Sequence, residues 1–309
     1  MNTRMPTRHT FEVTASSSAA LPTAVWEYPA VRGDLLGASA RPVLLVHGFR
    51  GDHHGMNLIA RDLRSRQVFV PDLPGFGETP PLAEGLTLQA YTAWLDALVH
   101  EIARRTGRSP LVVGHSFGSI LVAHWAAGSD GASDLSPTRT TDVLAFINPI
   151  TSPALEGPSR FMTALARFYY AVSAKLPERA GLAVLGHPLI VRIMSEVMAT
   201  TRDRGLRRYI HDQHARYFST FSDRDSLAEA FDVSVSHTVR EVEQSLMMPV
   251  HVIAGTADAV APEPGTRAFV AALPRASVEW FSGVGHLVHY ERPLRTAQSL
   301  EEFWTREGV

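Results

Sequence analysis

The stretch LVVGHSFGS at residues 111–119 decides the fold. A short apolar run ends in Gly114, and the polar pair His115 and Ser116 follows before a further glycine, Gly118. One interpretation is a buried strand, a turn and a helix whose N-cap is Ser116, with its hydroxyl accepting a hydrogen bond from a backbone N–H. The other is a serine nucleophile displayed on a strained turn between strand and helix.

Runs with the character of strands lie on both sides of this stretch. They are residues 11–16 and 25–30, which are placed to pair antiparallel, and 42–48, 68–72, 111–115, 143–148, 250–255 and 277–283. Helical patterns separate them, at residues 54–66, 87–105, 117–127, 264–273 and 292–304. Strands that alternate with helices predict an α/β fold with a parallel or mostly parallel sheet.

One long segment breaks this alternation. From Pro149 to about Arg240, apolar residues recur at helical spacing and no convincing strand appears. An all-helical block inside an α/β pattern indicates an insertion that sits over the sheet as a lid. We therefore predict a core domain in two parts, residues 1–148 and 241–309, with a helical cap at residues 149–240.

Composition and charge exclude several classes of protein. Hydrophobic residues make up 45% of the 309 residues and charged residues 19%, which is typical of a globular chain with a large core. A net charge of −2 provides no overall field that would attract nucleic acid. Because cysteine is absent, disulfides, cysteine-ligated zinc and a thiol nucleophile are excluded. We find no uncharged apolar run of about 18 residues and no apolar leader, so we expect a soluble, cytoplasmic protein.

The pentapeptide Gly114-His115-Ser116-Phe117-Gly118 has the pattern G-x-S-x-G between an apolar strand and a helix, as a nucleophile elbow requires. The turn is so tight that side chains two residues before and after the serine would crowd each other or a neighbouring strand. Strain on the backbone of Ser116 would project its Oγ above the sheet. The dipole of the following helix would favour negative charge there.

A serine hydroxyl needs a base, and a third group must orient that base. Among the 14 histidines, His286 follows the last predicted strand, where a loop residue can reach the end of a neighbouring strand. His289 is the alternative, three residues later at the start of a helix, where packing or capping would also explain it. His115 adjoins Ser116, but neighbours on so tight a turn point apart, so we interpret it as structural.

We expect the acid at the C-terminal end of another strand. Asp258 lies in such a loop, shortly after the run 250–255. The preceding strand ends in Asn148-Pro149 without an acid. Asp72 also lies at a strand end, and we interpret it as holding the loop that follows. The predicted order along the chain is therefore nucleophile, acid and base.

Attack on a carbonyl also requires hydrogen-bond donors for the developing oxyanion. One predicted donor is the backbone N–H of Phe117, directly after the nucleophile. The second is the N–H of Phe49 in His47-Gly48-Phe49, where glycine lets the backbone approach closely. We expect His47 to order this loop by hydrogen bonding.

Together these motifs resemble the α/β-hydrolase superfamily. In chain order they are the His-Gly after an early strand, the D-x-P-G-x-G segment at residues 72–77, the Ser116 elbow, the Asp258 loop and the His286 loop. The resemblance covers about residues 30–148 and 241–309. It implies a mostly parallel eight-stranded α/β-hydrolase sheet with a helical cap inserted after the sixth strand. Haloalkane dehalogenases and epoxide hydrolases of this superfamily have Asp at the elbow, so Ser116 favours the serine-dependent, esterase- and lipase-like branch instead.

The predicted function is hydrolysis of a small or medium apolar carboxylic ester through an acyl-enzyme on Ser116. Three alternatives stay open. A carbon–carbon bond hydrolase of a vinylogous diketone would use the same three residues. An acyltransferase would pass the acyl group to an acceptor other than water, and a ligand receptor on this fold would bind its ligand with little turnover.

The acyl pocket is predicted from apolar side chains of the cap. They are Phe161, Phe168, Tyr169, Met194, Met198 and Phe221. Flexible methionine beside aromatic rings suits an adaptable apolar pocket, although packing of one cap helix on another would also explain each residue. A basic run from Arg202 to Arg216 is interpreted as a solvated face, with attraction of an anionic substrate or lipid surface as the alternative.

Nothing in the residues demands a nucleotide, flavin or metal, so we expect no cofactor. His53-His54 with Asp52 and His47 matches no zinc signature, and a surface loop is the simpler interpretation. The expected partner is a small-molecule ester, without nucleic acid and without integral membrane association, and a homodimer stays open.

Overall fold

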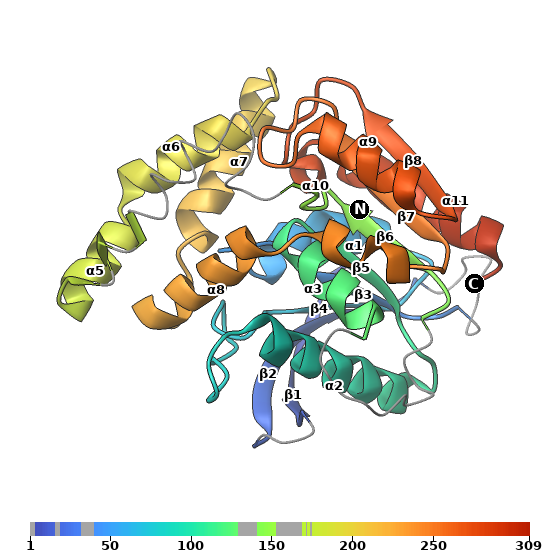
Figure 1. Ribbon diagram of the computed structural model, residues 1–309, viewed down its shortest axis with the longest axis horizontal. Coiled ribbons are helices and arrows are strands. Elements are labelled where there is room, and N and C mark those ends of the chain that lie inside the picture. The colour runs from blue at the N-terminus through green and yellow to red at the C-terminus, as the bar shows by residue number, and fades with distance from the viewer. Residues whose placement is uncertain are drawn as a thin grey trace.

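A computed structural model of the chain describes residues 4–15, 19–31, 40–128, 141–152, 169–170, 172–173 and 175–309. These residues build an eight-stranded sheet in the order β1-β2-β4-β3-β5-β6-β7-β8 (Figure 1). The strands are β1 Thr7–Val13, β2 Leu21–Tyr28, β3 Val43–Val46, β4 Val68–Pro71, β5 Leu111–His115, β6 Leu144–Ile147, β7 Val250–Gly255 and β8 Ala276–Phe281. β2 pairs antiparallel with β1 and β4, and all other neighbours are parallel, which confirms the predicted mostly parallel sheet.

Helices cover both faces of the sheet, because successive residues of each strand point to opposite sides. On β3, Leu44 and Val46 face one core and Val43 and Leu45 face the other. The first core packs against α2 (Leu88–Thr106), α3 (Phe117–Ala126) and α9 (Glu263–Ala272). The second packs against α1 (Asn57–Asp62) and α11 (Pro293–Glu307). Strands buried on both faces explain why their sequences read as continuous apolar runs.

Between β6 and β7 the chain forms further helices, as the broken alternation predicted. They are α5 Glu178–Leu185, α6 Pro188–Met198, α7 Arg204–Tyr217 and α8 Arg224–Ser236, followed by the 3-10 helix η3 Val239–Ser245. In Figure 1, α5, α6 and α7 project beyond the sheet, whereas α8 leads back to it. A third core, in which Ile210 of α7 meets Leu287 and Tyr290, joins this segment to the chain around α10 (Val288–Glu291). The division into domains at residues 148 and 240 stays a prediction.

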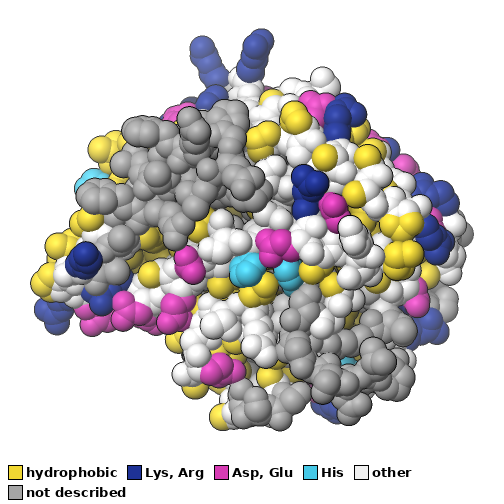
Figure 2. Space-filling view, viewed as in Figure 1, with side chains coloured by type: hydrophobic (Ala, Val, Ile, Leu, Met, Phe, Trp, Pro, Cys, Tyr) yellow, Lys and Arg dark blue, Asp and Glu magenta, His cyan; other side chains and the backbone are white. Residues whose placement is uncertain are grey.

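The segment Glu178–Met198 is apolar, with a mean hydropathy of 1.3 in its most apolar window. By length and composition alone it could cross a membrane, but it is divided into α5 and α6 at Gly186 and His187. Only 22% of that window is buried, and Leu189, Ile193 and Val197 of α6 form an exposed stripe at a spacing of four. Figure 2 shows hydrophobic side chains among charged ones on this side of the molecule.

Three predicted boundaries were wrong. β2 begins at Leu21 rather than at residue 25 and ends at Tyr28 rather than at residue 30. β1 begins at Thr7 rather than at residue 11, because an edge strand carries polar side chains such as Arg8 and Glu12 on its open face, which hides the strand pattern. The helix predicted for residues 54–66 is shorter, since it divides into the 3-10 helix η2 (His53–Met56) and α1, which ends at Asp62. Leu63, the C-cap of α1, leaves the helical conformation and turns the chain toward β4.

Candidate active site

Ser116 lies on a strained turn that joins β5 to α3. Its backbone φ is 53°, and although it is the N-cap residue of α3, its side chain makes no capping hydrogen bond, so the capping role considered for its hydroxyl is wrong. A non-glycine residue at such a φ is uncommon, and strain of this kind collects at functional sites. From Leu111 to Trp125, Ser116 is the only residue that is not buried. The turn therefore presents one hydroxyl at the surface of an otherwise closed core.

The two glycines of the elbow are required by space. A Cβ on Gly114 would lie 2.6 Å from the carbonyl oxygen of Gly118. A Cβ on Gly118 would overlap the carbonyl oxygen of Val46 on the neighbouring strand β3. These contacts are the crowding that the sequence analysis expected, both across the turn and against the adjacent strand.

Three predicted residues meet at the C-terminal edge of the sheet. The imidazole Nε2 of His286, in the loop after β8, lies 2.7 Å from Ser116 Oγ. Its Nδ1 lies 2.8 Å from Oδ2 of Asp258, in the loop after β7. The sequence analysis placed all three at the ends of parallel strands, and the structure brings them together in the predicted order.

The Asp258 carboxylate is buried and fully engaged, with its side chain 1% exposed. Oδ1 accepts hydrogen bonds from the backbone N–H groups of Val260, at 2.8 Å, and Ala261, at 2.9 Å. Burial by itself would raise the pKa of Asp258, but His286 and these N–H groups outweigh it and hold the pKa below its usual value. Because Asp258 is ionised, Nδ1 of His286 donates to it, and Nε2 is free to accept the Ser116 proton.

The loop after β3 lies directly against the serine. A Cβ on Gly48 would lie 3.1 Å from Ser116 Cβ, and the rings of Phe49 and Phe117 pack edge to face with centroids 6.2 Å apart. His47 orders the loop as expected, since its Nδ1 lies 2.8 Å from the carbonyl oxygen of Gly48 and its Nε2 accepts from Leu73 N at 2.9 Å. This arrangement places the two predicted oxyanion donors, the N–H groups of Phe49 and Phe117, on segments that flank Ser116.

The other histidines near Ser116 are buried packing residues. The rings of His289 and His115 contact each other with centroids 4.2 Å apart, whereas His286 is the histidine that bonds Ser116. Burial lowers the pKa of His115 to about 3 and lowers the pKa of His289 well below its usual value. Both rings are therefore neutral near neutral pH.

The residues predicted to line the acyl pocket differ in how close they lie to Ser116. Phe161 and Phe168 lie outside the described residues. Tyr169 packs on a neighbouring helix, since its hydroxyl donates to the carbonyl oxygen of Val184 at 2.8 Å. Met198 comes near the site, because its carbonyl oxygen would lie 3.2 Å from a Cβ on Gly285, the residue before His286.

Met194 is half-buried on α6. Phe221 packs against the main core, and the Arg50 guanidinium lies 5.5 Å above its ring.

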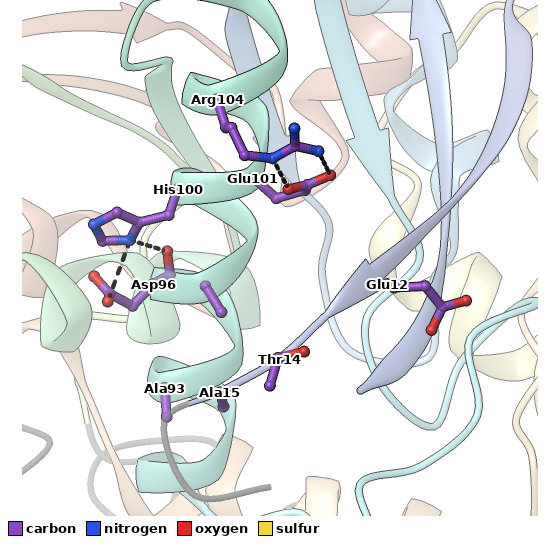
Figure 3. Close-up of a pocket in the computed structure, with 9 residues that line it drawn as sticks. Glu12, Thr14, Ala15, Ala93, Asp96, His100, Glu101 and Arg104 are labelled. Carbon is purple, nitrogen blue, oxygen red and sulfur yellow. Dashed lines mark hydrogen bonds and ion pairs between the residues drawn. The ribbon is translucent and has the colours of Figure 1, made fainter. Parts of the chain in front are cut away.

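A separate pocket of about 440 Å³ lies between the end of β1 and α2 (Figure 3). Its lining is charged, and in Figure 3 Arg104 faces Glu101 while His100 faces Asp96. None of the predicted site residues lines it. The charged side chains that α2 contributes to this pocket are thus already paired with one another.

Among the described residues, two groups could hold a metal ion, and in both the ligand atoms already bond protein partners. They are Asp52-His53-His54 and His124-His237-Glu241. In the first group, His53 Nδ1 bonds Asp72 at 2.9 Å and His54 Nδ1 bonds Asp52 at 3.0 Å. Asp72 also accepts from the backbone N–H of Glu78, so it holds the following loop as the sequence analysis expected.

The sequence analysis missed Arg50, although it follows a predicted oxyanion donor. Arg50 is buried with φ 61°, and its guanidinium donates to the carbonyl oxygens of Leu185 at 2.8 Å and Phe218 at 3.1 Å. These oxygens lie at the C-terminal ends of α5 and α7, where helix dipoles favour a cation. Arg50 thus ties the α5–α8 helices to the loop beside Ser116. Nothing in the sequence distinguishes Arg50, because an arginine beside a glycine is typical of an exposed loop.

Comparison with known proteins agrees with this architecture. The model of the alpha/beta hydrolase family matches residues 43–299, so the chain belongs to that family.

Three similar proteins match this chain at low identity or over a short segment. An uncharacterized protein of Mycobacterium tuberculosis is 25% identical over 283 residues, which cover 87% of this chain and 76% of that protein. Lipase 1 of Psychrobacter immobilis is 32% identical over 90 residues, 29% of this chain and 28% of the lipase. A thermophilic esterase from Thermogutta terrifontis superposes with a TM-score of 0.73 at 20% identity, covering 98% of this chain and all of the esterase.

Proposed function

We propose that this protein is a serine hydrolase that cleaves carboxylic esters through an acyl-enzyme on Ser116. The observation that carries the proposal is the hydrogen-bond chain from Ser116 Oγ through the His286 imidazole to the buried Asp258 carboxylate. It begins at an accessible hydroxyl and ends at a buried, ionised acid, as activation of a serine requires.

In the first half of the proposed reaction, His286 Nε2 takes the Ser116 proton while Oγ attacks the ester carbonyl. The N–H groups of Phe49 and Phe117 stabilise the oxyanion, and the dipole of α3 adds to their effect. The imidazolium then returns its proton to the leaving alcohol. Asp258 holds the imidazole in the required tautomer and stabilises its charge.

In the second half, water takes the place of the alcohol. His286 removes a proton from that water, the hydroxide attacks the acyl carbonyl, and the Ser116 oxygen leaves with the proton from the imidazolium. The products are a carboxylic acid and the free serine. No redox change and no further co-reactant is involved.

Two kinds of observation support an ester as the substrate. Lipase 1 and the Thermogutta esterase are similar to this chain and are named for ester cleavage. The apolar and aromatic surroundings of the serine, in which Phe49 packs against Phe76 and Tyr170, suit an ester with an apolar part. We propose a small or medium ester, with α5–α8 acting as the cap over the site.

A fluorophosphonate probe tests this proposal, because it reacts with activated serines. We expect one labelled peptide, containing Ser116, and loss of labelling in Ser116→Ala. A series of p-nitrophenyl esters of increasing acyl length then tests the pocket, with a clear optimum at short to medium chains. Labelling confined to another residue, or turnover that is indifferent to chain length, would contradict the serine assignment or the lined pocket respectively.

A further inference from the structure

Asn148 lies at the end of β6, where it touches both loops that carry the acid and the base. Its Nδ2 donates to Asp258 Oδ2 at 2.7 Å, and this is the oxygen that also accepts from His286. The same amide nitrogen lies 3.4 Å from the carbonyl oxygen of Gly285, the residue before His286. One buried amide thus contacts the Asp258 loop and the His286 loop together.

The conformation of Asn148 is costly. Its φ is 46°, its side chain is fully buried, and its Oδ1 has no hydrogen-bond partner among the residues that the structure describes. A buried polar atom without a partner and a non-glycine residue at positive φ both oppose folding. The backbone N–H of Asn148 fixes this conformation by donating to the carbonyl oxygen of Ile253 at 2.8 Å. Costs of this kind persist where a function requires the geometry.

The Asn148 amide and the His286 imidazole share one oxygen of the Asp258 carboxylate. Oδ1 is occupied by two backbone N–H groups, so the charge available to His286 lies on Oδ2, where Asn148 competes for it. Each donor that stabilises the carboxylate weakens its attraction for an imidazolium. We propose that Asn148 is a positioning residue that limits the basicity of the Asp258–His286 pair and holds the two loops in register.

This inference rests on the proposed function, in which His286 must be neutral to act as a base. If the imidazole were held too tightly as a cation, the base would be lost at slightly acidic pH. The other titratable groups beside the His286 ring are His115, with centroids 5.6 Å apart, and His289 behind it. Both are buried rings on β5 and α10, and neither bonds Asp258, so Asn148 is the neighbour that modulates this carboxylate besides His286 and the backbone.

The test replaces Asn148 with glycine, which removes the donor and tolerates a positive φ. We expect the midpoint at which His286 titrates to rise by about one pH unit, as measured by NMR on protein with ¹⁵N-labelled histidine. The signal is assigned from its loss in His286→Gln. The acidic limb of the kcat/KM profile for a soluble ester should move upward by the same amount.

Two further variants provide an alternative substitution and a control. Asn148→Ser ends one atom short of the amide nitrogen, so it should give the same shift if Asn148→Gly does not fold. Asn57→Gly is the matched control, since Asn57 bonds Tyr28 and not the Asp258 loop, and it should leave the midpoint unchanged.

The NMR midpoint needs no substrate, so the two proposals can fail separately. An unchanged midpoint in folded Asn148→Gly or Asn148→Ser overturns the role of Asn148, whether or not esters are cleaved. A raised midpoint in a protein that cleaves no ester supports the role of Asn148 and contradicts the esterase proposal.

Discussion

Among the residues that the structure describes, two serines lie against an imidazole whose other side faces a carboxylate. In the first group, Ser116 bonds His286, which bonds Asp258. In the second, between α6 and α7, Ser195 Oγ lies 2.6 Å from His211 Nδ1, and His211 Nε2 lies 3.3 Å from Glu196. The chemical groups are the same kinds, so residue types alone do not separate the two groups.

Their surroundings separate them. Ser195 is 1% exposed inside a helix, and its hydroxyl also bonds His214 Nδ1 at 2.8 Å, so it is both inaccessible and held between two rings. The carboxylate of Glu196 is 41% exposed, whereas that of Asp258 is 1% exposed. A reactive serine needs an open hydroxyl and a buried acid, and the second group has the opposite arrangement.

The largest expected difference between the groups is in turnover. Ser116→Ala should lower kcat for an activated ester by about 10⁴-fold or more, because the acyl-enzyme cannot form. Ser195→Ala should keep nearly full activity and instead lower the free energy of unfolding by about 1–3 kcal/mol, since two buried rings lose a partner. Ester assays and urea unfolding of both variants check this. Full turnover in Ser116→Ala, or a large loss in Ser195→Ala, would reverse the assignment.

The second largest loss of kcat is expected from a substitution in the turn that carries Ser116. Gly118→Ala adds a Cβ against Val46, so the turn must shift, and a displacement of about 1 Å at the nucleophile should cost about 10²-fold in kcat. Gly205→Ala, at an exposed position in the first turn of α7, is the control and should leave kcat unchanged. Equal activity of the two variants would show that the elbow tolerates a side chain.

Most of the fold and the positions of the proposed catalytic residues could be predicted from the sequence. β5 and β7 have the predicted bounds, because strands buried on both faces are unbroken apolar runs. Ser116, Asp258 and His286 could be placed together since the C-terminal ends of parallel strands meet at one edge. These inferences use local patterns that one sequence contains.

The residues that the sequence analysis missed take their positions from tertiary contacts. Asn148 and Arg50 owe their positions to positive φ angles and to contacts with segments more than 100 residues away, which no local pattern encodes. The pocket prediction had the same weakness, because helical spacing identifies an apolar face but not what it packs against. Tyr169 illustrates this, since it bonds a neighbouring helix.

Acid should destabilise the second group through His214, whose Nδ1 bonds Ser195. Burial, with His211 nearby, lowers the pKa of His214 to about 4 from the usual 6.5. Between these values the unfolded chain binds a proton that the folded protein does not, so stability is complete above pH 6.5 and is lost as the pH falls toward 4. The loss from this residue approaches about 3 kcal/mol.

His214→Gln should therefore have a flatter stability curve than the parent between pH 6.5 and 4, measured by urea unfolding at several pH values. His100→Gln, at a position on α2 where the side chain is 43% exposed, is the matched control for the loss of an imidazole. Parallel curves for His214→Gln and the parent would mean that the ring is already protonated in the folded state.

The smallest effect is expected at the carboxylate of the second group. Glu196 is exposed and pairs with Arg192 at 2.6 Å and Arg207 at 3.1 Å, so solvent and salt screen its interactions. Glu196→Gln should therefore change the Tm by no more than about 2 °C and leave kcat unaltered. Asp258→Asn, the same chemical change at the buried acid, should reduce kcat by about 10⁴-fold, because the imidazole loses its tautomer. If the two substitutions had similar effects on kcat, burial of the acid would not be what distinguishes the two groups, and the proposed role of Asp258 would have to be given up.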